Sequence, residues 1–204
     1  MASSRIAGNL GQWSAMQAID ALLKRRSAKA LTDPAPDAGA LALLLECASR
    51  APDHGRLRPW RFIVIRGAAR ERLGELMADQ LLRKLPSASA ETLQRERQKA
   101  LRAPLIIAVA AVCNATAKVP AIEQVLAAGA AAQNVMLAAT ALGFGAMWKT
   151  GDAAYDDTVK AALGLTAGDA IVGFLYLGTA AADAVPPPAR AEWQDRVSYW
   201  GERP

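Results

Sequence analysis

The 204-residue chain is poor in the residues that build many catalytic centres. It has one histidine and two cysteines, with no HExxH pattern and no paired CxxC, so a resident catalytic metal is not expected. It also lacks the GxxxxGK(S/T) phosphate loop, the GxGxxG fingerprint and the GxSxG nucleophile elbow. If the chain is an enzyme, a bound cofactor should therefore carry the reaction.

Long hydrophobic runs are missing as well. The longest apolar stretch, residues 105–112, is far shorter than the roughly 20 residues that a membrane-spanning helix needs. The first residues, MASSRIAGNLGQW, contain no apolar run typical of a signal peptide. Cys47 and Cys113 have no metal-type spacing and fit buried thiols in a reducing compartment. We therefore expect a cytoplasmic protein that does not associate with membranes.

Aromatic residues make up only 5% of the chain, and this limits what its positive charge can mean. A formal charge of +5 and a pI near 9.5 suggest a nucleic-acid partner. However, the basic residues are interspersed with acidic ones, as in Arg70, Glu71 and Arg72, and few aromatics are available to stack on bases. The composition favours a pocket for a small anionic ligand, such as a phosphorylated cofactor, and no nucleic-acid partner is expected.

The most prominent feature that is present is a helical stretch from Pro120 to Leu142. Apolar and small residues recur at helical spacing almost all round it, so the helix should be buried on more than one side. The small residues at 128–132 would let another backbone come close, and the expected partner is the same helix of a second subunit. Gly143 and Gly145 should end the helix, and residues 146–151 (AMWKTG) should follow as a short strand or turn at a site.

The remaining pattern predicts one domain over residues 1–204, with a flexible N-terminus at 1–13 and an extended tail at 182–204 that packs along this subunit or its partner. Periodicity predicts helices at 14–26, 37–51 and 155–163, and two charged surface helices within 68–102 that could cover a cleft. Apolar, β-rich runs predict core strands at 60–65, 105–112 and 171–177.

Candidate ligand-binding residues occur in two places. Arg25, Arg26 and Ser27 follow the first helix, where guanidinium groups could clamp a phosphate through their forked donors. The alternative is that these cations only stabilise a solvated helix terminus. His54 lies in a loop just before a strand, where ligands often bind, although an ordinary surface histidine also fits this position.

Taken in order, these segments resemble the nitroreductase family, most closely its small YdjA-like members. The resemblance is carried by RRS at 25–27, SRAPDH at 49–54 with RPW at 58–60, the Gly/Ala-rich helix, and AMWKTG at 146–151 before GFLYLG at 173–178. Each motif alone is weak. Their succession from about Met16 to Thr179 is fairly specific.

The resemblance implies an α+β fold of three layers, with a mixed central sheet flanked by helices, in an intertwined homodimer that binds FMN in two clefts at the subunit interface. The matching cofactor-binding positions are Arg25, Arg26 and Ser27 at the phosphate and ribityl chain, Arg50 and His54 beside the flavin, and Trp148, Lys149 and Thr150 along the isoalloxazine. Lys149 could act through its charge near the N1–O2 edge or through its backbone alone, because alternate residues of a strand face opposite ways.

The implied activity is NAD(P)H-dependent reduction of nitroaromatic, quinone or similar small acceptors by ping-pong hydride transfer. No side chain is expected to act as a catalytic acid or base, because flavin N5 carries the chemistry. Contacts with NAD(P)H are expected at the end of the central helix, at Thr140, Ala141, Leu142 and Gly143. A basic pair that larger members carry after the last strand is missing here, so either Arg25 and Arg26 do more of the phosphate binding or Arg190 helps.

Two other interpretations remain open at this point. One is a different flavin enzyme of the same fold, such as a dehalogenase or a flavin-fragmenting enzyme. The other is a non-catalytic, basic dimeric module that binds nucleic acid. A bound flavin would separate the enzymes from the module.

Overall fold

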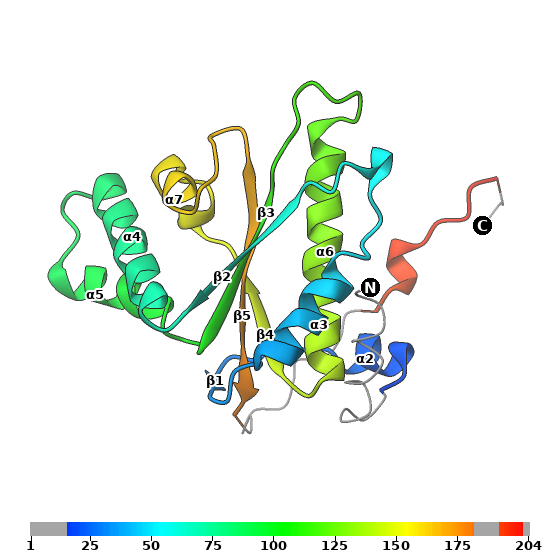
Figure 1. Cartoon of the computed structure of the whole chain (residues 1–204), viewed down its shortest axis with the longest axis horizontal. Coiled ribbons are helices and arrows are strands. Elements are labelled where there is room, and N and C mark those ends of the chain that lie inside the picture. Colours follow the sequence, from blue (N-terminus) through cyan, green and yellow to red (C-terminus); the bar gives the residue numbers. More distant parts are fainter. Residues whose placement is uncertain (1–15, 182–191, 202–204) are drawn as a thin grey trace.

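A computed structural model describes residues 16–181 and 192–201 of the chain. A single sheet lies between two layers of helices (Figure 1). Helices α3 (Ala38–Ala48) and α6 (Ala121–Ala141) cover one face, and α4 (Ala68–Lys84) and α7 (Asp157–Ala162) cover the other. The predicted α+β architecture of three layers is confirmed.

The sheet contains β1 (Leu31–Thr32), β2 (Trp60–Arg66), β3 (Leu105–Ala111), β4 (Gly145–Lys149) and β5 (Ala170–Ala180). The strands follow the order β1-β5-β3-β2. Strand β4 also pairs with β5, along the edge of β5 opposite to β3.

All pairs between these strands are antiparallel. The one parallel contact within the described residues is the bridge between Ser27 and Ala146, so the sheet is mixed only at this edge. The last residue of β2, Arg66, pairs with the first residue of β3, Leu105. The helices between the two strands therefore return the chain to the end of the sheet at which β2 finished, and β3 runs antiparallel to β2.

The other helical elements of the described residues are α2 (Ala18–Lys24), α5 (Ala90–Lys99) and the 3₁₀ turns η2 (His54–Arg56), η3 (Asp152–Ala154) and η4 (Gln194–Arg196). The first helix begins at Ala18, after a predicted start at Ser14 that lies outside the described residues. The predicted break near residues 85–87 separates α4 from α5, and Ser89 caps α5 by accepting a hydrogen bond from the Thr92 backbone N–H.

The core is divided by β3, which is buried along its whole length. Ile106 and Ala108 pack in the cluster under α4 and α7, whereas Ile107 and Val109 pack in the cluster under α3 and α6. This alternation follows from the two-residue period of a strand, and it explains why a strand buried on both faces is apolar without interruption.

Helix α6 has the bounds that its sequence predicts. It follows Pro120 and ends in a pair of hydrogen bonds, from Gly143 N to Thr140 O at 3.1 Å and from Phe144 N to Ala139 O at 2.8 Å. These bonds form a Schellman motif, which needs a left-handed residue, and Gly143 supplies it with φ of +81°. The chain can therefore turn sharply into β4.

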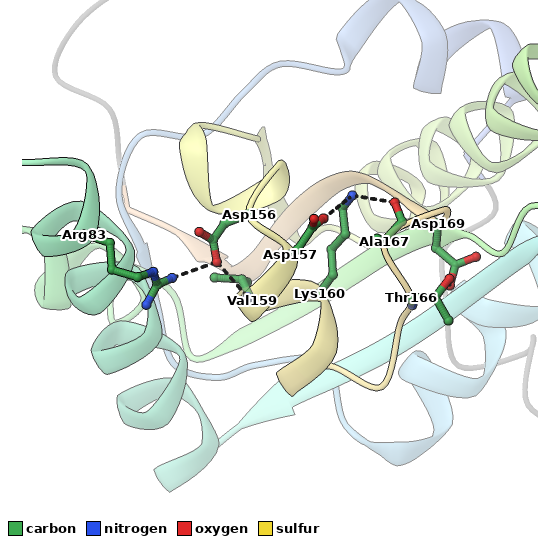
Figure 2. A network of polar contacts seen from close by, with 8 residues as sticks. All are labelled: Arg83, Asp156, Asp157, Val159, Lys160, Thr166, Ala167 and Asp169. Atoms are coloured by element: carbon green, nitrogen blue, oxygen red, sulfur yellow. Dashed lines mark hydrogen bonds and ion pairs between the residues drawn. The ribbon is translucent and has the colours of Figure 1, made fainter.

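Two aspartates, Asp156 and Asp169, form hydrogen bonds that hold α7 and its neighbouring segments in place (Figure 2). Asp156 caps α7 by accepting a hydrogen bond from Val159 N at 2.9 Å, and it also accepts one from Arg83 of α4 at 2.8 Å. Desolvation alone would raise the pKa of Asp156, but these hydrogen bonds outweigh it and hold the pKa below its usual value. Asp169 is buried and accepts from Thr166 and from the backbone of Cys113, which likewise lowers its pKa against desolvation.

The described part of the tail, residues 192–201, is exposed along its length. Trp193, Tyr199 and Trp200 are exposed, Trp200 completely so. The prediction that the tail packs along this subunit or its partner stays a prediction, and residues 182–191 and 202–204 of the tail lie outside the described residues. Among the helices of the described ranges, none has the length and apolar character needed to span a bilayer.

Candidate functional site

The segment after α2 lies against the start of β4. The backbone N–H of Ala28 donates a hydrogen bond to the carbonyl of Ala146 at 2.9 Å, next to the bridge between Ser27 and Ala146. Arg25, the C-cap of α2, has the extended backbone (ψ 128°) that takes the chain from the helix to the sheet edge. The structure therefore brings the predicted phosphate-binding residues next to the strand that carries the predicted flavin-binding residues.

The outer edge of β4 continues from this contact. In an antiparallel pair, the N–H and C=O of one residue point to the same side, and successive residues alternate. Since the carbonyl of Ala146 points outward to Ala28, the backbone groups of Trp148 point outward too. No strand pairs with this edge beyond Ala146 in the ranges that the structure describes. The edge therefore presents a short row of backbone donors and acceptors.

The side chain of Trp148 lies on the α3–α6 face of the sheet. Its indole Nε1–H donates to the carbonyl of Val172 at 3.2 Å. A Cβ at Gly173 would lie 2.1 Å from this Nε1, so only glycine leaves room for the ring. In the sequence Gly173 is only the first residue of the GFLYLG motif, although a glycine inside an apolar strand indicates a close approach of this kind.

Lys149 points to the opposite face. It pairs with Phe174, which belongs to the cluster under α4 and α7, and it lines a cavity there together with Tyr176. Its backbone groups face β5, by the same alternation that turns those of Trp148 outward. Trp148 and Lys149 thus present side chains to different layers, and a single flat ligand cannot stack on both.

Arg50 and His54 lie beside different parts of α6: Arg50 lines a groove with α2 and the C-terminal half of α6, whereas His54 contacts its first turn. Arg50 forms an ion pair with Glu46 of α3 at 2.7 Å, and this hydrogen bond raises the pKa of Arg50. His54 Nδ1 lies 2.5 Å from the Glu123 carboxylate, in the first turn of α6. His54 thus lies at the N-terminal end of α6, away from the bridge between Ser27 and Ala146.

Helix α6 separates His54 from the predicted phosphate segment, whereas Arg50 lies on the same side as α2. His54 contacts the N-terminal turn of α6, whereas Ser27 contacts Ala146, which follows the C-terminal end of this helix. A helix of 21 residues is about 30 Å long. Within one chain, the predicted phosphate segment and His54 therefore lie at opposite ends of α6.

The residues expected to contact NAD(P)H form the last turn of α6 and its cap. The Thr140 hydroxyl donates to the Met136 carbonyl at 3.0 Å, and Gly143 forms the Schellman turn. Ala141 lines a shallow groove, described next. Arg190, the alternative phosphate ligand, lies outside the described residues.

An apolar surface runs over α2 and α6. A groove of about 380 Å³ lies between α2, α3 and α6, lined mainly by apolar side chains such as Leu22 and Leu137, with Arg50 at its side. Beyond it, Ile122 and Leu126 of α6 are 62% and 64% exposed. Exposed apolar side chains gathered on two neighbouring helices are typical of a protein interface.

The chain belongs to the nitroreductase family: the model of the "Nitroreductase family" matches residues 22–179. A relative from Escherichia coli K12, named "Putative NAD(P)H nitroreductase YdjA", is 40% identical over 164 residues, which cover 80% of this chain and 88% of the relative. A Haemophilus influenzae protein named "Putative NAD(P)H nitroreductase" is 35% identical over 185 residues, covering 90% of this chain and 100% of that protein.

Solved structures of the same fold agree. A nitroreductase-like family protein from Bacillus cereus superposes with a TM-score of 0.78 at 25% identity, covering 93% of this chain and 98% of the other. A "putative nitroreductase in complex with FMN" from Desulfovibrio desulfuricans has a TM-score of 0.70 at 26% identity, covering 94% and 99%. The recognition from sequence is therefore confirmed at the level of family and fold.

Proposed function

We propose that this chain is an FMN-dependent NAD(P)H oxidoreductase that reduces small oxidised acceptors, such as nitroaromatics or quinones, as a cytoplasmic homodimer. The observation that carries this proposal is the contact of the Arg25–Ser27 segment with the outer edge of β4. Membership of the family supports it, as do a relative named for NAD(P)H and a solved structure that holds FMN.

The groups along this edge suit the parts of FMN in order. Arg26 and Ser27 are exposed at the start of β4, where a guanidinium and a hydroxyl can bind a phosphate. The outward backbone groups of Trp148 follow, and Thr150 comes directly after the strand; their backbone groups can bind the heteroatoms of the ring edge. The edge thus has charged and hydroxyl groups at one end and backbone donors beside the half-buried indole of Trp148 at the other. This order matches a ligand with a phosphate at one end and a flat ring at the other.

A homodimer would complete this site. If two copies of α6 pack antiparallel about a two-fold axis, the N-terminal end of one helix lies near the C-terminal end of the other. His54 and Arg50 of the partner subunit would then approach the β4 edge that His54 cannot reach within its own chain. The exposed Ile122 and Leu126, together with the apolar groove beside α2, supply the surface that such an interface buries.

When bound, FMN supplies the chemistry, because its N5 can accept hydride from NAD(P)H and later pass it to the acceptor in a ping-pong sequence. The chain's own residues bind and orient. Arg25 and Arg26 hold the phosphate, and the β4 backbone fixes the ring plane. The last turn of α6, Thr140–Gly143, lies beside the same edge and is the proposed contact for the nicotinamide cofactor.

One spectroscopic experiment tests the proposal. Purified protein, with FMN added and excess removed, should show the absorption bands of oxidised flavin. Anaerobic NADH or NADPH should bleach these bands, and menadione or a nitroaromatic should restore them. A protein that retains no flavin after reconstitution would refute the assignment.

A further inference from the structure

The chain has one histidine, and its ring is tied to the central helix by a carboxylate. His54 Nδ1 lies 2.5 Å from Glu123 Oε2, in the first turn of α6. Figure 1 shows the loop before β2 beside this end of α6. Among the residues that the structure describes, His54 forms no other side-chain hydrogen bond or ion pair. Glu123 therefore sets the orientation of the ring.

The contact also determines which ring nitrogen carries a proton. A carboxylate has only acceptor sites, so Nδ1 must be the donor in this hydrogen bond. The second nitrogen, Nε2, is left for another partner, because the bond made by one nitrogen of a histidine fixes the role of the other. The side chain of His54 is 68% exposed even though Nδ1 is engaged. The Nε2 edge of the ring is therefore accessible.

The loop that carries His54 has an unfavourable backbone conformation. Arg56 and Arg58 have φ of +54° and +49°, in the left-handed region that residues other than glycine rarely adopt. Asp53 holds the turn, because its carboxylate accepts a hydrogen bond from the Arg58 N–H at 2.6 Å. Strained residues of this kind persist where their surroundings impose them, and they cluster at functional sites.

Close packing presses the same loop against the start of α6. Gly55 has φ of +74°, and a Cβ there would lie 3.1 Å from Val119 Cγ2. Val119 directly precedes Pro120, the N-cap of α6. The contact between His54 and Glu123 is thus supported by packed backbone on both sides and does not depend on two free side chains meeting.

Stability of the single chain does not account for this arrangement. Glu123 is 40% exposed, and an ion pair between exposed side chains contributes little to stability. The pair instead borders the surface proposed for the dimer. Ile122 is 62% exposed and Leu126 is 64% exposed, and Leu126 lies three residues after Glu123, which places the two on one face of α6.

We propose that Glu123 is a positioning residue of the flavin site. It accepts the Nδ1–H of His54 and thereby directs Nε2 at a polar atom of the FMN that the partner subunit binds. Glu123 itself does not touch the flavin and acts through His54. The inference rests on the proposed function, since His54 and Ser27 lie at opposite ends of α6 within one chain and only a dimer brings them to one site.

The first test is nuclear magnetic resonance of the ring, which needs no assignment because there is one histidine. Untagged, full-length protein labelled with ¹⁵N-histidine is measured by long-range ¹H–¹⁵N correlation, before and after saturation with FMN. Nδ1 should be protonated in both states, and FMN should shift the Nε2 resonance. Glu123→Gln should lose the preference for a protonated Nδ1, because an amide can both donate and accept.

The second test is FMN affinity. Glu123→Gln should weaken FMN binding by about threefold to tenfold, because Nε2 remains available but the ring is no longer oriented. Glu91→Gln is the matched control, since Glu91 also lies in the first turn of a helix, α5, and pairs with Arg95 at 3.5 Å. It should bind FMN as the wild type does. Melting temperatures of all variants are recorded, because a merely structural role would lower them without changing the state of the ring.

A double-mutant cycle shows whether Glu123 acts through His54. In a His54→Gln background the ring is absent, so Glu123→Gln should change FMN affinity by less than about twofold. In the wild-type background the same substitution should have its full effect. This difference between backgrounds is the signature of a positioning residue.

The outcomes separate this inference from the proposed function. Loss of the Nδ1 preference and weaker FMN binding in Glu123→Gln, both dependent on His54 and absent in Glu91→Gln, support it. An unchanged ring and unchanged affinity, or an equal loss of affinity with and without His54, overturns it while the wild type still binds FMN. A wild type that binds no FMN refutes the proposed function and this inference with it.

Discussion

The indole of Trp148 occupies the space that a side chain at residue 173 would need. Its Nε1 would lie 2.1 Å, and its Cδ1 2.6 Å, from a Cβ at Gly173, while the same Nε1 donates to the neighbouring Val172 carbonyl at 3.2 Å. The position of Trp148 beside the outer edge of β4 thus depends on a glycine in β5. A substitution at Gly173, in the middle of the sheet, should therefore alter the proposed flavin site.

Gly173→Ala should displace Trp148 and break its hydrogen bond to Val172. Overpacking of this kind costs about 1–3 kcal/mol of unfolding free energy, and the displaced ring should also weaken FMN binding. Urea unfolding and FMN titration measure the two effects. Gly168→Ala is the control, because a Cβ there meets nothing closer than the Thr166 hydroxyl at 3.9 Å. Equal stability and FMN affinity in Gly173→Ala and the wild type would show that the indole can move at no cost.

Arg26→Ala should weaken FMN binding by about 10–100-fold, because a charge-assisted hydrogen bond contributes roughly 1.5–3 kcal/mol. Its cost to folding should be smaller, since a cation at a helix end contributes only about 0.3–1 kcal/mol. Titration of apoprotein with FMN and thermal unfolding give both values. Arg66→Ala, at the exposed end of β2, should change neither. A lowered melting temperature with unchanged FMN affinity would return Arg26 to a helix-terminal role.

Leu126→Arg should shift the protein from dimer to monomer. Leu126 is 64% exposed in the single chain, so the change should do little to a monomer, but it would bury a charge in the proposed α6 interface. Sedimentation velocity at several concentrations measures the assembly. Leu82→Arg, at a 41% exposed position on α4, is the control and should keep the assembly of the wild type. A wild-type protein that is monomeric and still binds FMN would contradict the shared site.

Asp156→Asn should make the free energy of unfolding less dependent on pH below about pH 5. Because the folded pKa of Asp156 lies below its unfolded value of about 3.9, the carboxylate stabilises the fold above that pH, and this contribution disappears as pH falls through the folded pKa. Asparagine still caps a helix well, so the loss in the variant is that of the charge interaction with Arg83.

Urea unfolding at pH 7, 5, 4 and 3 measures this effect. The wild type should lose more stability than Asp156→Asn between pH 5 and pH 3. Asp157→Asn is the control, because its carboxylate is mostly exposed and pairs only with Lys160 among the described residues, at 3.2 Å. Parallel profiles for the wild type and Asp156→Asn would mean that Arg83 and Asp156 contribute no net stability.

The sequence by itself determined the elements and the family. Helix α6 could be read from Pro120 to the glycine stop at Gly143, since both signals are local properties of the backbone. The strand at residues 105–111 could be read from its uninterrupted apolar run, which only burial on both faces accommodates. The order of short motifs, each weak alone, was enough to recognise the nitroreductase family.

Only the tertiary structure decided which of the candidate residues meet. Local patterns do not encode strand register, and register is what turns the Trp148 and Lys149 side chains to opposite faces and leaves Gly173 under the indole. Likewise, nothing in the spacing of His54 and Ser27 shows that α6 holds them at opposite ends. Glu123 lies 69 residues from His54 in the sequence, so their contact exists only once the loop before β2 has packed against the first turn of α6.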